Sequence, residues 1–127
     1  MTKLMRISAG DNIRDLQEEF MRLYPFLRIQ FYRARPGNEA IVRGNYLNQL
    51  LPIKTAGLKS EGFISLESNM TIAELENKLL DQFGLRAKIL RQSGNNIWLE
   101  TSLTADWPLN RQNEHGRELS GGYRADQ

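Results

Sequence analysis

The sequence predicts one α+β domain with a ferredoxin-like arrangement, in which two strand-helix-strand units share an antiparallel sheet. Three observations lead to this prediction. Two amphipathic helical segments are each bracketed by strands, the two units can be aligned position by position, and 127 residues suffice for one hydrophobic core. Apolar residues make up 40% of the chain and charged residues 25%, as in ordinary globular proteins.

The first unit begins with a strand over residues 5–8. A helix follows, because apolar side chains recur at spacings of three and four: Ile13, Leu16, Phe20, Leu23 and Tyr24. Pro25 disfavours the helical conformation at the residue before it and ends this helix. Residues 27–32 then alternate between apolar and polar side chains, which predicts a strand with one buried face.

The second unit follows the same plan, with a strand over 63–67, a helix and a strand over 85–90. Thr71 and Glu74 have the spacing of a capping box, in which each side chain binds a backbone amide of the other residue. Gly84 is placed to end the helix in a left-handed turn. The apolar positions of this helix are Ile72, Leu75, Leu79 and Phe83.

An alignment of the two units supports duplication or a shared topology. When Ile13 is matched to Ile72, the other apolar helix positions coincide, and so do the caps Asn12 and Thr71. Right-handed crossovers would then interleave the strands in one sheet with both helices on one face. The residues expected to point toward these helices are Met5, Ile7, Leu27, Ile29, Phe31, Ile64, Leu66, Leu85, Ala87 and Ile89.

The rest of the sequence predicts a long connection between the two units and an additional strand after the second unit. Residues 34–62 form a long connection, with turns at 36–38 and 44–45 and a short helix that stops near Pro52. After the second unit, residues 93–95 predict a hairpin turn into a fifth strand over 96–101, with Ile97 and Leu99 on the core face.

The C-terminal segment predicts one further helix. Asp106 can cap a short helix from Trp107 to His115, and Gly116 follows it as a stop. The residues after this point have little apolar content to offset the entropy cost of ordering them. We therefore expect a domain over 1–117 and a disordered tail over 118–127.

The outer face of the predicted sheet mixes cationic and aromatic side chains and is the candidate interaction surface. Its members are Arg6, Arg28, Gln30, Tyr32, Arg86, Lys88, Trp98 and Trp107. In one interpretation the last helix folds back so that Trp107 and Leu109 cover Trp98. In another, Tyr32 and Trp98 stack bases while the cations neutralise phosphates, although the formal net charge is only +2.

Composition and motifs exclude several kinds of chemistry. The chain has no cysteine, so it has no disulfide, thiolate nucleophile or sulfur-ligated metal. Its single histidine, His115, lies at the end of a predicted helix, and no glycine-rich phosphate loop is present. We expect no catalytic residue, cofactor or metal. The function predicted is a non-enzymatic protein-interaction module that can also self-associate, and the alternative is a nucleic-acid-binding domain.

No segment has the 18 or more apolar residues of a membrane span, and residues 1–10 lack the apolar core of a secretory signal. We therefore expect a cytoplasmic protein that does not enter a membrane.

Several segments together resemble a family of small uncharacterised bacterial proteins. They are Leu16-Gln-Glu-Glu-Phe20, Met70-Thr71 with Glu74-Leu75-Glu76, Ile97-Trp98-Leu99-Glu100-Thr101, and Asp106-Trp107 with Gln112-Asn113. The resemblance spans nearly the whole chain and implies that the C-terminal segments belong to the domain. It implies no activity, cofactor or partner.

Overall fold

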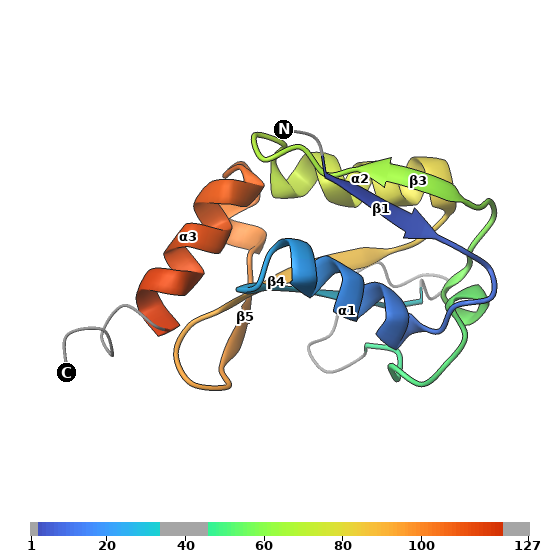
Figure 1. Ribbon diagram of the computed structural model, residues 1–127, viewed down its shortest axis with the longest axis horizontal. Coiled ribbons are helices and arrows are strands. Elements are labelled where there is room, and N and C mark those ends of the chain that lie inside the picture. Colours follow the sequence, from blue (N-terminus) through green and yellow to red (C-terminus); the bar gives the residue numbers. More distant parts are fainter. Residues whose placement is uncertain (1–2, 34–45, 121–127) are drawn as a thin grey trace.

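The computed structural model describes residues 3–33 and 46–120 (Figure 1). The strands and helices follow the predicted order, with small shifts at their ends. They are β1 (Leu4–Ile7), α1 (Ile13–Leu23), β2 (Leu27–Phe31), the 3-10 helix η1 (Ile53–Ala56), β3 (Gly62–Ser65), α2 (Ile72–Phe83), β4 (Ala87–Gln92), β5 (Trp98–Glu100), the 3-10 helix η2 (Ser102–Thr104) and α3 (Leu109–Ser120).

The strands form two antiparallel sheets. β1 pairs with β3 alone, whereas β4 lies between β2 and β5 in the order β2-β4-β5. The fold is α+β, but the single ferredoxin-like sheet is not confirmed, because that sheet would place β2 and β4 at opposite edges. Here β2 and β4 pair directly, with Ile29 opposite Ile89. Figure 1 shows α1 in front of the larger sheet and α2 behind the β1–β3 ribbon.

The predicted core is confirmed. All ten inward-facing strand residues are buried, none with more than 4% of its surface exposed. The helical positions Ile13, Leu16 and Phe20 on α1 and Ile72, Leu75 and Leu79 on α2 complete the same cluster. One continuous apolar core therefore joins both sheets and both helices, as the spacing of apolar residues in each segment predicted.

The two units share local features that the sequence alignment matched. The alignment that matches Ile13 to Ile72 also matches Met5 to Ile64, and these two residues face each other in the β1–β3 ribbon. Both helices begin with a capping box, at Asn12 and Asp15 in α1 and at Thr71 and Glu74 in α2. The predicted caps at Asn12 and Thr71 and the left-handed end at Gly84 are thus confirmed.

A proline segment anchors the start of each helix, and the sequence patterns used above did not identify it. Asn12 forms an isolated antiparallel bridge with Pro52, and Thr71 forms the matching bridge with Pro108. In both cases a large aliphatic residue, Ile53 or Leu109, follows the proline and is fully buried. Each half therefore consists of a strand-helix-strand unit followed by a proline anchor.

Two predictions about the connecting segments need correction, and a third concerns residues outside the described range. The short helix of the connection lies after Pro52, as η1, because Pro52 has an extended conformation and precedes its first turn. Ile97 and Leu99 are exposed by 52% and 44%, because the short strand β5 lies beyond the reach of the core. The predicted turns at 36–38 and 44–45 lie outside the described residues.

The last helix also differs from its prediction. It begins at Leu109, passes through Gly116 and ends at Ser120, so that residues 118–120 of the predicted tail are helical. Gly116 is required by packing, because a Cβ atom there would lie 2.9 Å from the Phe26 Cβ. Residues 121–127 lie outside the described range. Across 3–33 and 46–120, no helix combines the length and apolar content that crossing a bilayer would demand.

Candidate interaction surface

The structure brings together six of the eight predicted surface residues. Arg28, Gln30 and Tyr32 follow one another along β2 and its end, and Gln30 lies opposite Lys88 on β4. Tyr32 donates its backbone N–H to the carbonyl of Arg86, which places these two residues in the next row of the same sheet. Trp98 lies on β5. Arg6 lies on the other sheet, in β1, and Trp107 precedes α3.

The polar groups of this face are largely engaged within the chain. The Arg28 guanidinium carbon lies 4.6 Å from the centre of the Trp98 ring, in a cation–π contact. Lys88 Nζ lies 3.8 Å from Glu76 Oε1. The hydroxyl of Tyr46 donates a hydrogen bond to the Glu100 carboxylate. The face is therefore less available to phosphates than its sequence suggests.

Each helix uses one polar side chain to cover a backbone group on the larger sheet. Gln17 on α1 donates from Nε2 to the carbonyl of Ile29, at 2.9 Å. At the matching position of α2, Glu76 Oε2 accepts the N–H of Ile89, at 3.1 Å. Burial raises the pKa of Glu76, and Lys88 opposes this effect only in part. The backbone N–H of Leu47 donates a hydrogen bond to another β2 carbonyl, that of Phe31, with an N···O distance of 2.8 Å.

β5 forms the other edge of this sheet, and its outer side has no paired strand among the described residues. Ser93 donates to the carbonyl of Ile97, and Thr101 donates to the carbonyl of Ile89, so residues 97, 99 and 101 direct their backbone groups toward β4. Antiparallel pairing then directs the N–H and C=O groups of Trp98 and Glu100 away from β4. Within the described part of the chain, these four groups have no hydrogen-bonding partner.

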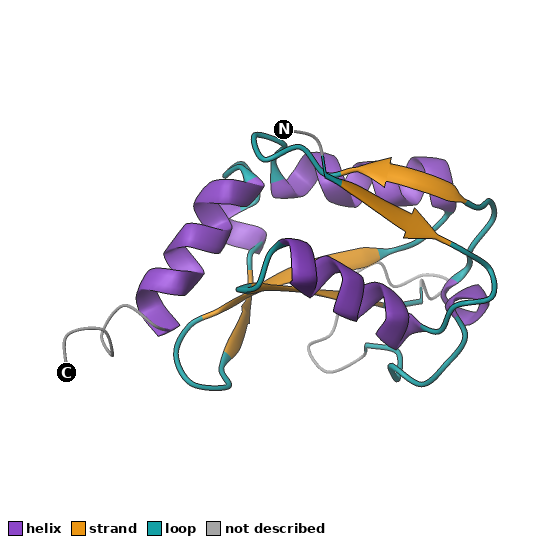
Figure 2. Cartoon of the chain, viewed as in Figure 1, coloured by secondary structure: helices purple, strands orange, loops and turns teal. Residues whose placement is uncertain are grey.

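Exposed apolar side chains accompany this open edge. Ile97 and Leu99 lie on the same side of the strand, and Leu103, shortly after β5, is 99% exposed. Figure 2 shows the β4–β5 hairpin at the lower left, below α3. We use the term β5 edge for the outward backbone groups of Trp98 and Glu100 together with the side chains of Ile97 and Leu99.

The inner side of the hairpin is fixed by α3. Gly94 donates its N–H to Ser120 Oγ at 3.2 Å, and Arg91 donates to Gln112 Oε1 at 3.3 Å. Gln112 is fully buried and donates in turn to the Thr104 carbonyl at 2.9 Å. The hairpin is therefore held on one face by a helix, while no residue of 3–33 or 46–120 pairs with its outer strand edge.

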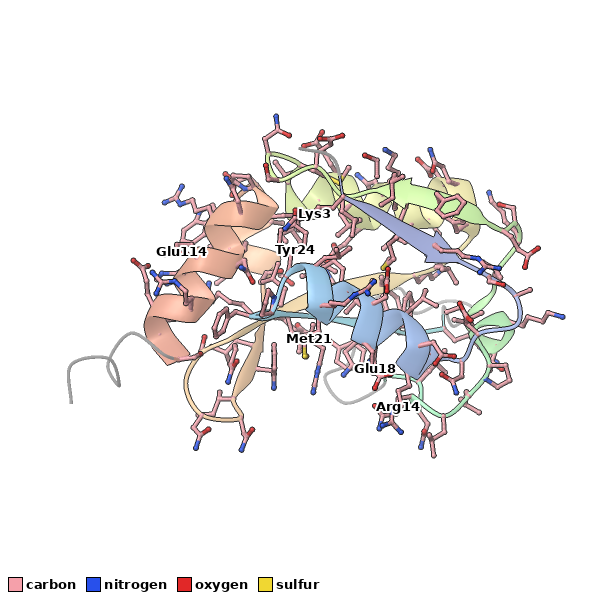
Figure 3. All side chains as sticks on the ribbon, viewed as in Figure 1. Lys3, Arg14, Glu18, Met21, Tyr24 and Glu114 are labelled. Carbon is pink, nitrogen blue, oxygen red and sulfur yellow. The ribbon has the colours of Figure 1, made fainter. Side chains whose placement is uncertain are left out.

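The outer surface of α3 carries the remaining aromatic group. Arg111 lies 4.0 Å from the Trp107 ring centre, and the His115 ring contacts Trp107 edge-on at 5.6 Å. These residues line a shallow surface depression together with Asn110, Glu114 and Glu118. Figure 3 shows Glu114 on the outward side of this helix. The ring contacts of Trp107 are thus with Arg111 and His115 on α3, and the side chain that stacks on Trp98 is Arg28.

The β1–β3 ribbon also exposes apolar side chains, Leu4 by 56% and Phe63 by 64%. Its strand ends are tied to the helices beside it. Lys3 donates from Nζ to the Leu23 carbonyl at 3.0 Å and lies 4.2 Å above the Tyr24 ring, and Figure 3 shows these two side chains together. Before β3, the Lys59 N–H binds the Phe83 carbonyl at the end of α2.

Comparisons with known proteins give no relative, because no family model, curated protein or solved structure matches the chain. Among residues 3–33 and 46–120, no group of three or more histidine or acidic side chains is placed to hold a metal ion.

Proposed function

We propose that this chain is a non-enzymatic protein-interaction module that docks a partner strand on the β5 edge. One observation carries the proposal: four backbone hydrogen-bonding groups on Trp98 and Glu100 face outward beside the exposed Ile97 and Leu99. Unpaired edge groups with apolar neighbours are the surface on which an added strand gains both main-chain hydrogen bonds and side-chain contacts. A cytoplasmic location remains part of this proposal.

The contrast with β2, the opposite edge of the same sheet, supports the choice of edge. Gln17 and Leu47 donate hydrogen bonds to two carbonyls on the outer side of β2. The β1–β3 ribbon also directs backbone groups outward, at Leu4 and Arg6 and at Phe63 and Ser65, so the contrast applies within the larger sheet alone. β5 has no comparable cover in the described part of the chain.

Site-specific photo-crosslinking in living cells tests this proposal. A benzophenone amino acid replaces Leu99 in one variant and Leu4 in a matched control, which is similarly exposed but lies on the helix-flanked ribbon. We expect discrete adducts from position 99, few from position 4, and loss of the position-99 adducts when Ile97→Lys is added. Adducts from position 4 with none from position 99 would contradict the proposal.

Nucleic-acid binding is the alternative function, and it has less support. Arg28 stacks on Trp98 and Lys88 pairs with Glu76, so two of its expected phosphate contacts already have partners. That alternative predicts strongly salt-dependent binding to single-stranded RNA that is lost in the double variant Arg28→Ala with Lys88→Ala. A fluorescence-anisotropy titration at low salt that shows no binding would eliminate it.

A further inference from the structure

The last hydrogen-bonded pair between β4 and β5 is only half formed. Arg91 lies opposite Leu99 in the ladder. Two residues further along each strand, the next pair that should exchange two hydrogen bonds is Ile89 with Thr101. Thr101 donates its N–H to the Ile89 carbonyl at 3.2 Å, as this pairing requires. The place of the return bond, from the Ile89 N–H to the Thr101 carbonyl, is taken by Glu76, whose Oε2 accepts that N–H at 3.1 Å.

Thr101 is already seated in the ladder but turns its carbonyl away from it. Its side chain is buried, and its Oγ1 donates to the Ile89 carbonyl at 2.7 Å. Its backbone angles, φ −100° and ψ 25°, are not those of a strand, and its carbonyl accepts the N–H of Thr104 at 3.1 Å instead. β5 therefore ends where this carbonyl bonds to η2 rather than to β4.

The Glu76 carboxylate is held at this position by both of its oxygens. Oε2 bonds to Ile89, and Oε1 lies 3.8 Å from Lys88 Nζ on the same strand. Only 18% of the Glu76 side chain and 20% of the Lys88 side chain are exposed. A residue of α2 thus occupies the point at which β5 would continue along β4.

We propose that Glu76 ends β5, and that withdrawal of its carboxylate lets the Thr101 carbonyl turn to Ile89 and complete the pair. Thr101 then becomes a strand residue. By alternation, the backbone groups of Ser102 then point outward beside those of Glu100 and lengthen the β5 edge. The edge therefore has a short form and a long form, and α2 determines which one is populated.

The exchange of bonds favours the long form once Glu76 is gone. The Ile89 N–H would otherwise lose its acceptor, which is costly for a donor covered by the protein. The bond given up is of the 3-10 type, whose geometry is poorer than that of a ladder bond. η2 has three residues and its Leu103 is 99% exposed, so unwinding it gives up little packing. Gln112 Nε2 holds the Thr104 carbonyl at 2.9 Å, which confines the change to residues 101–103.

The consequence for docking rests on the proposed function. A partner strand that reaches past Glu100 finds main-chain partners at Ser102 only in the long form. Because a ligand shifts a population toward the state that it binds better, such a strand favours the release of Glu76. Glu76 then acts as a positioning residue that links α2 to the length of the docking edge.

NMR couplings across hydrogen bonds test the alternative pairing directly. In the wild type we expect no coupling between the amide nitrogen of Ile89 and the carbonyl carbon of Thr101. In Glu76→Ala this coupling should appear, and any coupling from Thr104 to the Thr101 carbonyl should be lost. A folded Glu76→Ala variant without the Ile89–Thr101 coupling would overturn the proposal.

Two further variants keep the test decisive. Glu76→Gln retains an acceptor oxygen for Ile89 but forms no ion pair with Lys88, so it should keep the short form. Appearance of the Ile89–Thr101 coupling in Glu76→Gln would also overturn the proposal, because the bond to Ile89 would then not be what ends β5. If Glu76→Ala does not fold, Glu76→Asp takes its place, since its shorter side chain withdraws the carboxylate while keeping the charge.

Crosslinking separates this inference from the proposed function. With the benzophenone amino acid at position 99, Glu76→Ala should give a higher yield of adducts than Glu76→Gln, by up to about fivefold for one added hydrogen bond. If the new coupling appears but position 99 gives no adducts, the proposed function fails and the role of Glu76 stands. If adducts form but the coupling does not appear in Glu76→Ala, the role of Glu76 fails and the interaction module stands.

Discussion

The two edges of the larger sheet, β2 and β5, are treated differently by the rest of the chain. Gln17 reaches from α1 to a carbonyl on the β2 edge, and Leu47 covers the next one. The β5 edge keeps four backbone groups directed outward and two exposed apolar side chains beside them. Sheets that leave one edge open beside apolar residues risk pairing with other chains. The contrast between the bonded carbonyls of β2 and the outward groups of β5 supports the proposal that a partner strand pairs with β5.

The difference lies in how the two halves of the chain are arranged. Glu76 on α2 and Gln17 on α1 occupy matching positions and both bind the larger sheet. β5 has no equivalent in the first half of the described chain. It pairs with β4, and α3 contacts the hairpin on one face through the hydrogen bond from Gly94 to Ser120. The contact of α3 with the β4–β5 hairpin and the exposure of the β5 edge therefore depend on different residues. Mutations can test each of them separately.

The largest effect is expected where α3 supports the hairpin. Gly116→Val would place its Cβ 2.9 Å from the Phe26 Cβ and 3.1 Å from the Arg91 Cγ. Overpacking of this kind destabilises by about 2 kcal/mol. Urea denaturation would measure the loss, and Arg117→Val, at an exposed position of the same helix, is the control. Equal stability of the two variants would show that α3 does not hold the hairpin.

The next effect concerns the covered β2 edge. Gln17→Ala removes the donor to the Ile29 carbonyl and should lower the free energy of unfolding by about 1 kcal/mol. Glu18→Ala is the control, because Glu18 pairs with Arg14 on the exposed side of α1 (Figure 3) and such pairs contribute little. Crosslinking from position 99 should be unchanged in both variants. A Gln17→Ala variant as stable as the wild type would show that the hydrogen bond from Gln17 to the β2 edge does not stabilise the fold.

The smallest effect is a pH dependence at Glu76. Burial raises its pKa in the folded state, so its contribution to stability is complete below the ordinary glutamate pKa and is lost as the pH rises through the raised pKa. Glu76→Gln has no such step, so its stability relative to the wild type should increase with pH across this window. Glu74→Gln should change in the opposite direction, because capping hydrogen bonds with Thr71 lower the pKa of Glu74. The Glu74 step lies below the ordinary glutamate pKa and the Glu76 step above it, so thermal melts from about pH 2 to about pH 8 would compare them.

Much of the fold could be predicted from local patterns. The inward strand residues, the amphipathic helices and the caps at Asn12, Thr71 and Gly84 each depend on neighbours in sequence, and all were found as expected. Strand pairing was not predictable in the same way, because β2 pairs with β4 through contacts between distant segments. The repeated proline followed by an aliphatic residue, at 52–53 and 108–109, was an available signal for the duplicated anchors.

The candidate site could be predicted only in part. Alternation placed Arg28, Gln30, Lys88 and Trp98 on one face, but it could not show that Glu76 or Gln17 would bind members of that face from a helix. Alternation also assigned Ile97 and Leu99 to the core, since an apolar pair in a strand normally faces inward. Their exposure depends on how far β5 extends beyond the core, which is a property of the tertiary structure.

Amide hydrogen exchange, residue by residue, tests the open edge most directly. In dilute protein the Trp98 and Glu100 amides should exchange rapidly while the intervening Leu99 amide, which faces Arg91 on β4, exchanges slowly. When a partner strand docks on the β5 edge, the Trp98 and Glu100 amides should become protected. Protection of both amides in dilute monomer would show that the β5 edge is already covered and would contradict the assignment of that edge as the docking strand.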